Sequence, residues 1–88
     1  MNLEPAAIKR AIREKVIELA QNLGVDASAL QDDDIIPATG YLDSAGILEL
    51  VVWYENTYDF PLQQEEINID NLGSVNSMVA FLLSRKQS

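Results

Sequence analysis

Ser44 is the residue whose type and place in the sequence best suit chemistry. It follows Asp43 and opens an apolar-rich pattern that predicts a helix over residues 44–58, ended by Asp59 and Pro61. Free backbone N–H groups and the positive end of the helix dipole favour an anion at such a helix start. A hydroxyl there is therefore well placed to carry a phosphate group. The competing interpretation is an ordinary N-cap, because serine and aspartate are favoured at that position.

The composition excludes several kinds of catalytic and metal site. The 88 residues contain no cysteine and no histidine, so the chain has no disulfide, no thiolate metal site and no general base of the commonest type. A serine hydrolase is a poor interpretation, because no histidine would activate Ser44. The triplet Asp32-Asp33-Asp34 lacks the spacing of a calcium loop, so we expect a solvated loop or a helix cap there. We expect a scaffold with no catalytic residue and no metal site of its own, not an enzyme.

The charge is strongly acidic and unevenly distributed. Six lysines and arginines stand against 14 aspartates and glutamates, for a net charge of −8, and residues 16–84 contain no base. Such a surface repels nucleic acid and anionic lipid and attracts basic protein patches, although acidic charge also simply keeps a small domain soluble. We expect a monomer that binds neither nucleic acid nor membrane. A cytoplasmic location is expected because we find no signal-peptide pattern and no apolar run that could span a bilayer.

Helices are the elements that must position Ser44. Apolar residues recur at spacings of three and four, and no alternating strand pattern appears. We predict one all-α domain over residues 1–88, a small four-helix bundle with three main helices and one short helix. The helices are expected at about residues 5–22, 44–58, 65–69 and 74–86, with Ser74 as N-cap of the last and a long loop over 25–43. The expected inward positions are Ile8, Ile12, Val16, Leu19, Leu23, Leu30, Ile35, Ile36, Leu42, Ile47, Leu50, Val51, Tyr54, Tyr58, Ile67, Leu72, Val75, Met78, Val79 and Leu82.

Several short motifs occur in a characteristic order along the chain. They are Gly40-Tyr41-Leu42 before Asp43-Ser44, Leu48-Glu49-Leu50-Val51 after it, then Glu55, Phe60-Pro61, and Ser74-Val75 at the start of the last helix. Over nearly the whole chain this order resembles that of acyl carrier proteins and of the related peptidyl and aminoacyl carrier domains. The chain departs from the family pattern after the serine, where most carriers have leucine and this chain has Ala45 followed by Gly46. Either this pair lets a partner or the cofactor arm approach closely, or it is drift at an exposed position.

The resemblance implies a covalent cofactor. A phosphopantetheinyl transferase would use coenzyme A and Mg²⁺ to attach 4′-phosphopantetheine to Ser44, and Asp43 would help the transferase to hold the metal. The distal thiol would then carry acyl or aminoacyl groups as thioesters, which supplies sulfur to a chain without cysteine. The cargo stays open among fatty acyl, polyketide, peptidyl and aminoacyl groups, in fatty acid or secondary metabolite biosynthesis. Ala45-Gly46 and Trp53-Tyr54 favour a less typical branch, such as aminoacyl or specialised acyl carriers.

The outward face of the second helix is the expected partner surface. Helical geometry places small, apolar and acidic residues together there, and exposed apolar residues often mark binding surfaces. The residues of this expected surface are Ala45, Leu48, Glu49, Val52 and Glu55. The expected partners are the transferase and acyl or aminoacyl ligases and transferases with basic docking patches. The alternative is that the second helix is more buried than this. Trp53 lies on neither the inward nor the outward stripe, and it either covers the loop or rims the interface. The second function class is an unmodified acidic helical adaptor that binds a basic protein.

Overall fold

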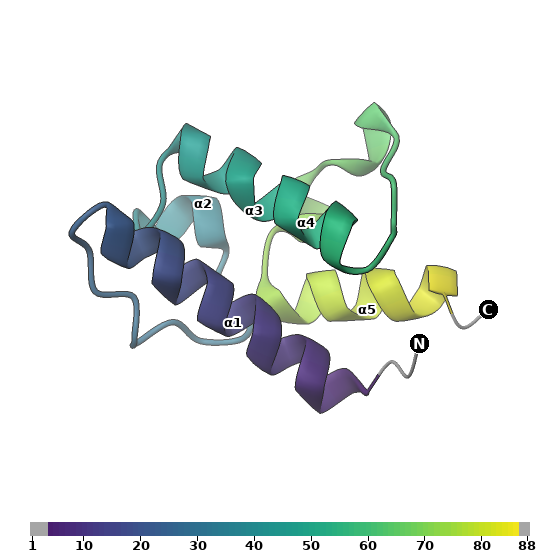
Figure 1. Cartoon of the computed structure of the whole chain (residues 1–88), viewed down its shortest axis with the longest axis horizontal. Helices are drawn as coiled ribbons and strands as arrows, with labels where there is room; N and C mark the ends of the chain where they lie inside the picture. The colour runs from purple at the N-terminus through teal and green to yellow at the C-terminus, as the bar shows by residue number, and fades with distance from the viewer. Residues whose placement is uncertain (1–3, 87–88) are drawn as a thin grey trace.

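Helices and turns make up all the regular structure in residues 4–86, the part of the chain that the computed structural model describes. The elements are α1 (Pro5–Asn22), α2 (Ile36–Thr39), α3 (Ser44–Thr57), the 3₁₀ turn η1 (Gln64–Glu66), α4 (Ile69–Leu72) and α5 (Val75–Lys86). Figure 1 shows α1 lying across the molecule, and it contacts both α3 and α5. The all-helical fold class predicted from the sequence is confirmed. The predicted long loop contains an additional helical turn, α2, and two turns, η1 and α4, take the place of the predicted short helix.

α1 covers the predicted range and buries the predicted stripe. Pro5 occupies its first turn, where the missing N–H of proline costs no hydrogen bond. The buried side chains of this helix are Ile8, Ile12, Val16, Leu19 and Ala20. The Leu23 N–H turns back to the Ala20 oxygen at 2.9 Å, and Gly24 has a φ of 76°, which favours glycine. Leu23 is 47% exposed, so its predicted core position is wrong, because it lies past the last turn of the helix.

The loop between α1 and α3 contains α2, a single helical turn that the sequence analysis did not predict. Pro37 lies in its first turn, and Gly40 follows it with a φ of 78°. Ile36 is buried, and its N–H donates to the Gly73 oxygen at 2.7 Å, which ties α2 to the end of α4. Ile35 is 40% exposed. Its predicted inward position is wrong, because the turn directs the neighbouring Ile36 into the core instead.

The acidic triplet of this loop is held by side chains from two helices. Arg13 of α1 hydrogen-bonds the Asp32 carboxylate, and Lys9 Nζ lies 3.3 Å from Asp32 Oδ2. Asn76 of α5 donates to Asp33 Oδ1 at 2.7 Å. The hydrogen bond from Arg13 is the main reason that the pKa of Asp32 lies below its usual range. The triplet therefore fixes the loop to the bundle.

α3 places its apolar face in the core. Its predicted inward residues are all buried or half-buried, namely Ile47, Leu50, Val51, Tyr54 and Tyr58. The Tyr54 hydroxyl donates to the Met78 backbone oxygen of α5 at 2.8 Å, and burial raises the pKa of that hydroxyl. The helix ends at Thr57, one residue before the predicted end.

Two single turns, η1 and α4, replace the one short helix predicted over 65–69. A capping box closes η1, and Asn68 begins α4 by accepting the Asn71 N–H at 2.9 Å. Ile67 lies between the two turns and is 43% exposed, so its predicted inward position is wrong. Leu72 packs against the core as predicted.

α5 closes the bundle and begins at Val75, one residue after the predicted start. Ser74 caps it as predicted, because its Oγ accepts the Ser77 N–H at 3.1 Å. The predicted inward residues of this helix are buried, namely Val75, Met78, Val79 and Leu82. Leu30 and Leu42 of the long loop are buried with them, as predicted.

Candidate functional site

Ser44 is the first residue of α3, and its side chain is exposed. Asp43, and not Ser44, caps the helix: Asp43 Oδ1 accepts the Gly46 N–H at 2.7 Å. The Asp43 backbone oxygen accepts the Ile47 N–H at 2.9 Å. Within residues 4–86 the Ser44 hydroxyl has no hydrogen-bond partner. Asp43 is therefore the N-cap of α3. The Ser44 hydroxyl is not needed for capping and is available for reaction.

The first turn of α3 offers hydrogen-bond donors to an anion. The Gly46 N–H is used by the cap, whereas the N–H groups of Ser44 and Ala45 have no partner among the described residues. After the capping Asp43, no acidic residue lies in the first turn of this helix. Free N–H groups and the helix dipole favour a phosphate at such a place. A phosphate ester on Ser44 fits this environment.

Gly46 is buried, whereas Ala45 is exposed. A Cβ atom on Gly46 would lie 3.2 Å from Asp43 Oδ1 and 3.4 Å from Leu42 Cβ. Drift at an exposed position is therefore wrong for Gly46. The glycine keeps space for the capping aspartate of its own chain.

The outward face of α3 is exposed, as the sequence predicted. Leu48 is 63% exposed and Val52 is 50% exposed, so the alternative of a more buried helix is wrong. Ala45 and Glu49 are exposed beside them. Glu55 is half-buried, and its Oε2 accepts the Leu62 N–H at 2.9 Å. Its carboxylate therefore fixes the segment that follows α3.

Trp53 is a residue of α3 that lies on the side of the helix facing α1. It is half-buried, and its ring meets the Tyr58 ring edge-on with centroids 6.0 Å apart. It also lines surface depressions together with Lys15 of α1. Trp53 therefore rims the exposed face of α3.

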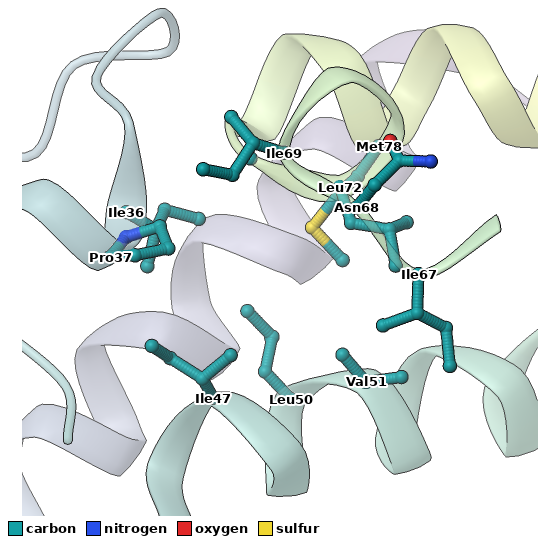
Figure 2. A pocket seen from close by; sticks show the side chains of 11 residues that line it. Ile36, Pro37, Ile47, Leu50, Val51, Ile67, Asn68, Ile69, Leu72 and Met78 are labelled. Atoms are coloured by element: carbon teal, nitrogen blue, oxygen red, sulfur yellow. The ribbon is translucent and has the colours of Figure 1, made fainter. Parts of the chain in front are cut away.

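An apolar cavity of about 180 Å³ lies on the other side of α3. Figure 2 shows Ile47, Leu50 and Val51 extending from α3 toward residues of α2, α4 and α5. The other lining residues are Ile36, Pro37, Ile67, Asn68, Ile69, Leu72, Gly73 and Met78. No charged side chain lines the cavity, and both ends of the Asn68 carboxamide are bonded, to the Asn71 N–H and the Glu65 oxygen. The cavity suits an apolar group and offers no charged partner for an ammonium ion.

The sequence analysis missed this cavity. Ile69 is exposed at 58% and Ile67 is also exposed, and both line it. The one available signal was the apolar series Ile67, Ile69 and Leu72, in a segment with few other inward positions.

Within residues 4–86, no group of three or more His, Cys, Asp or Glu side chains is placed to bind a metal ion. Within the same residues, no helix has the length and apolar character needed to cross a membrane.

Comparisons with known proteins identify relatives by sequence. No protein-family model matches the chain, and no solved structure matches it. The D-alanyl carrier protein of Streptococcus sanguinis is 36% identical over 69 residues, which cover 77% of this chain and 86% of that protein. That of Streptococcus pyogenes is 37% identical over 70 residues, covering 78% and 87%. That of Streptococcus gordonii is 35% identical over 69 residues, covering 77% and 86%.

Proposed function

The chain belongs to the carrier protein family of these D-alanyl carrier proteins, and we propose that it carries acyl or aminoacyl groups as thioesters on a 4′-phosphopantetheine arm attached to Ser44. Carrier proteins are non-catalytic, so the chain is not an enzyme. The observation that carries the proposal is the exposed Ser44 hydroxyl, which has no hydrogen-bond partner within residues 4–86 and lies at a helix start whose cap is supplied by Asp43. The attached thiol supplies the thioester chemistry that a chain without cysteine lacks.

Attachment of the arm requires a transferase and coenzyme A. The Ser44 oxygen forms a bond to the phosphorus that bears pantetheine, and the bond from that phosphorus to the adenosine half of coenzyme A breaks. The hydroxyl proton passes to a base of the transferase, because no histidine is available in this chain. The free N–H groups of the first turn of α3 would stabilise the new phosphodiester.

The Asp43 side chain can cap α3 and bind a metal ion at the same time. Its Oδ1 is used by the helix cap, whereas its Oδ2 has no partner within residues 4–86. The side chain is exposed. We expect Oδ2 to be one ligand of the Mg²⁺ ion that the transferase and coenzyme A hold between them.

The relatives favour an aminoacyl cargo, since each is named for D-alanyl. The cavity favours a second candidate, an apolar acyl cargo, because Ile47 lines it one turn after Ser44 and no charged group faces it. A cargo with an ammonium group would stay outside. The two are distinguished by loading the arm with alanyl or with short acyl groups and comparing NMR shifts of the Val51 and Met78 methyls. An acyl group inside the cavity moves these signals, whereas an alanyl group leaves them unchanged.

Intact mass tests the attachment itself. A transferase with coenzyme A and Mg²⁺ should add the mass of one phosphopantetheine to the wild-type protein and to Ser84→Ala, a control at an exposed serine of α5. Ser44→Ala should gain nothing. An unchanged wild-type mass with several transferases would contradict the proposal and favour the unmodified acidic adaptor.

A further inference from the structure

A small pocket lies between the end of α1 and the start of α3, beside Ser44. Its lining residues include Leu19, Asn22 and Leu23 on the α1 side and Asp43, Ala45 and Glu49 on the α3 side. We call it the Ala45 pocket. Its volume is about 110 Å³. Because an apolar cavity of about 150 Å³ accepts a benzene ring, the Ala45 pocket suits a slightly smaller group.

The α1 side of the Ala45 pocket is apolar and preformed. Leu19 is buried, whereas Leu23 is 47% exposed although it is a large apolar side chain. The Leu23 N–H donates to the Ala20 oxygen at 2.9 Å, and the Val25 N–H donates to the same oxygen at 2.8 Å. These hydrogen bonds fix the turn that carries Leu23. The apolar wall therefore needs no rearrangement to receive a ligand.

The α3 side of the pocket is kept open by a small residue. Ala45 is exposed and directly follows Ser44. A leucine at this position would add three carbon atoms at the wall of the pocket and would occupy part of its space. The cap explains why residue 46 is glycine, whereas it does not explain why residue 45 is small.

Polar groups at the border of the pocket lack partners. The side chains of Asn22 and Glu49 are exposed and make no hydrogen bond within residues 4–86. A carboxylate only accepts hydrogen bonds, whereas a carboxamide both donates and accepts them. The carboxylates of Asp43 and Glu49 also disfavour an anion inside the pocket. The complementary ligand is therefore uncharged, with an apolar group next to hydroxyl or N–H donors and a carbonyl oxygen.

The first part of a 4′-phosphopantetheine arm has this chemistry. Its phosphate is followed by a methylene, a carbon that bears two methyl groups, a carbon that bears a hydroxyl, and an amide. Building on the proposed function, we infer that the Ala45 pocket is the resting site of this part of the arm in the unloaded protein. The methyl groups would contact Leu19 and Leu23, and the hydroxyl and amide would bond Asn22 and Glu49. The phosphate would stay outside, at the free N–H groups of α3.

Attachment to the same chain makes a shallow pocket sufficient. A group on a short flexible linker acts at an effective concentration of about 1 mM, so a pocket with a dissociation constant of about 1 mM is occupied about half of the time. The methyl-bearing carbon lies only one methylene and one oxygen from the phosphorus, which keeps it close to a pocket that borders Ser44 on both sides. The competing occupant is a side chain of a partner enzyme, which would leave the pocket empty in the isolated protein.

NMR of the isolated, unloaded protein tests the inference. A transferase attaches an arm from coenzyme A that carries ¹³C in the two methyl groups and ¹⁵N in the first amide. The wild type should show nuclear Overhauser effects between the arm methyls and the methyls of Leu19. The order parameter of the arm amide should lie above about 0.6, outside the range of flexible groups.

Two variants should release the arm. Ala45→Leu fills the pocket, and its matched control is Ala80→Leu, the same change at an exposed alanine of α5. Leu23→Ala removes the apolar wall, and its matched control is Leu48→Ala at an exposed leucine outside the pocket. Both pocket variants should lose the effects at Leu19 and bring the amide order parameter below about 0.6, whereas both controls should keep the wild-type values. Circular dichroism and intact mass verify that each protein is folded and carries the arm.

The outcomes separate the pocket from the attachment. A modified wild type with no contact between the arm and Leu19 overturns the inference, and so do contacts that persist in both pocket variants. In either case the gain in mass upholds the proposed function. If the wild type gains no mass at all, the proposed function fails and this inference fails with it.

Discussion

The observed cap and the proposed metal role of Asp43 lead to a prediction that separates stability from modification. Its Oδ1 accepts the Gly46 N–H at 2.7 Å, and this is the hydrogen bond that closes the N-terminus of α3. Replacing an aspartate cap by alanine costs about 1 kcal/mol, whereas asparagine caps about as well. Asp43→Ala should therefore lower the free energy of unfolding by about 1 kcal/mol, or the melting temperature by about 4–8 °C for a domain of this size. Asp43→Asn should lose no more than about 0.5 kcal/mol, the part due to its charge at the helix dipole.

Modification, unlike stability, should not distinguish the two variants. Asparagine keeps the cap but removes the carboxylate that we expect to bind Mg²⁺, so both variants should lose transferase kcat/KM by a similar factor. The measurements are urea denaturation followed by circular dichroism, and transferase kinetics on each folded variant. Asp43→Asn with wild-type kcat/KM would refute the metal role. Equal destabilisation of the two variants would refute the assignment of Asp43 as the cap.

Three further predictions concern the scaffold. Tyr54→Phe removes the hydrogen bond to the Met78 oxygen at 2.8 Å and should lower the free energy of unfolding by about 1 kcal/mol, measured by urea denaturation; an unchanged value would mean that this bond adds nothing. Gly73→Ala should destabilise by about 1–3 kcal/mol and perturb the cavity, because its Cβ would lie 2.3 Å from the Ile69 oxygen, and a fully stable variant would contradict this. The pKa of Asp32 is lowered in the folded state by its hydrogen bond from α1, so its contribution is present above the ordinary pKa of 3.8 and is lost as the pH falls through the folded value. Asp32→Asn should therefore be less stable than the wild type at neutral pH, and a stability difference that persists undiminished in strong acid would refute this.

The sequence predicted the long helices well because their signals are local. Apolar spacing, Pro5 and the residues after Asn22 define α1, and the predicted and observed ranges are the same. The errors at Leu23, Ile35 and Ile67 have a common cause. Each is a cap residue: Leu23 and Ile67 follow a helical segment, and Ile35 precedes one. At such positions the cap decides which neighbouring side chain enters the core.

Features built from several elements could not be read from the sequence in this way. The cavity is lined by residues of α2, α3, α4 and α5, whose register depends on hydrogen bonds such as that from the Ile36 N–H to the Gly73 oxygen. The choice between Asp43 and Ser44 as the cap was also open, because both residues suit that position equally. The hydrogen bond to Gly46 decided it.

Under the proposed function, the position of Ser44 on α3 would let the carrier hold its cargo and dock at the same time. Successive helical residues are rotated by about 100°, so Ile47 lines the cavity while its neighbours Leu48 and Glu49 line a surface depression beside Lys15 of α1. Ser44 is the first residue of the same helix. An arm attached there can turn toward the cavity without covering this depression. Substitutions on one face of α3 should therefore affect cargo shielding or docking separately, and a substitution at Leu48 that changed docking should leave the Val51 methyl shifts of a loaded arm unaltered.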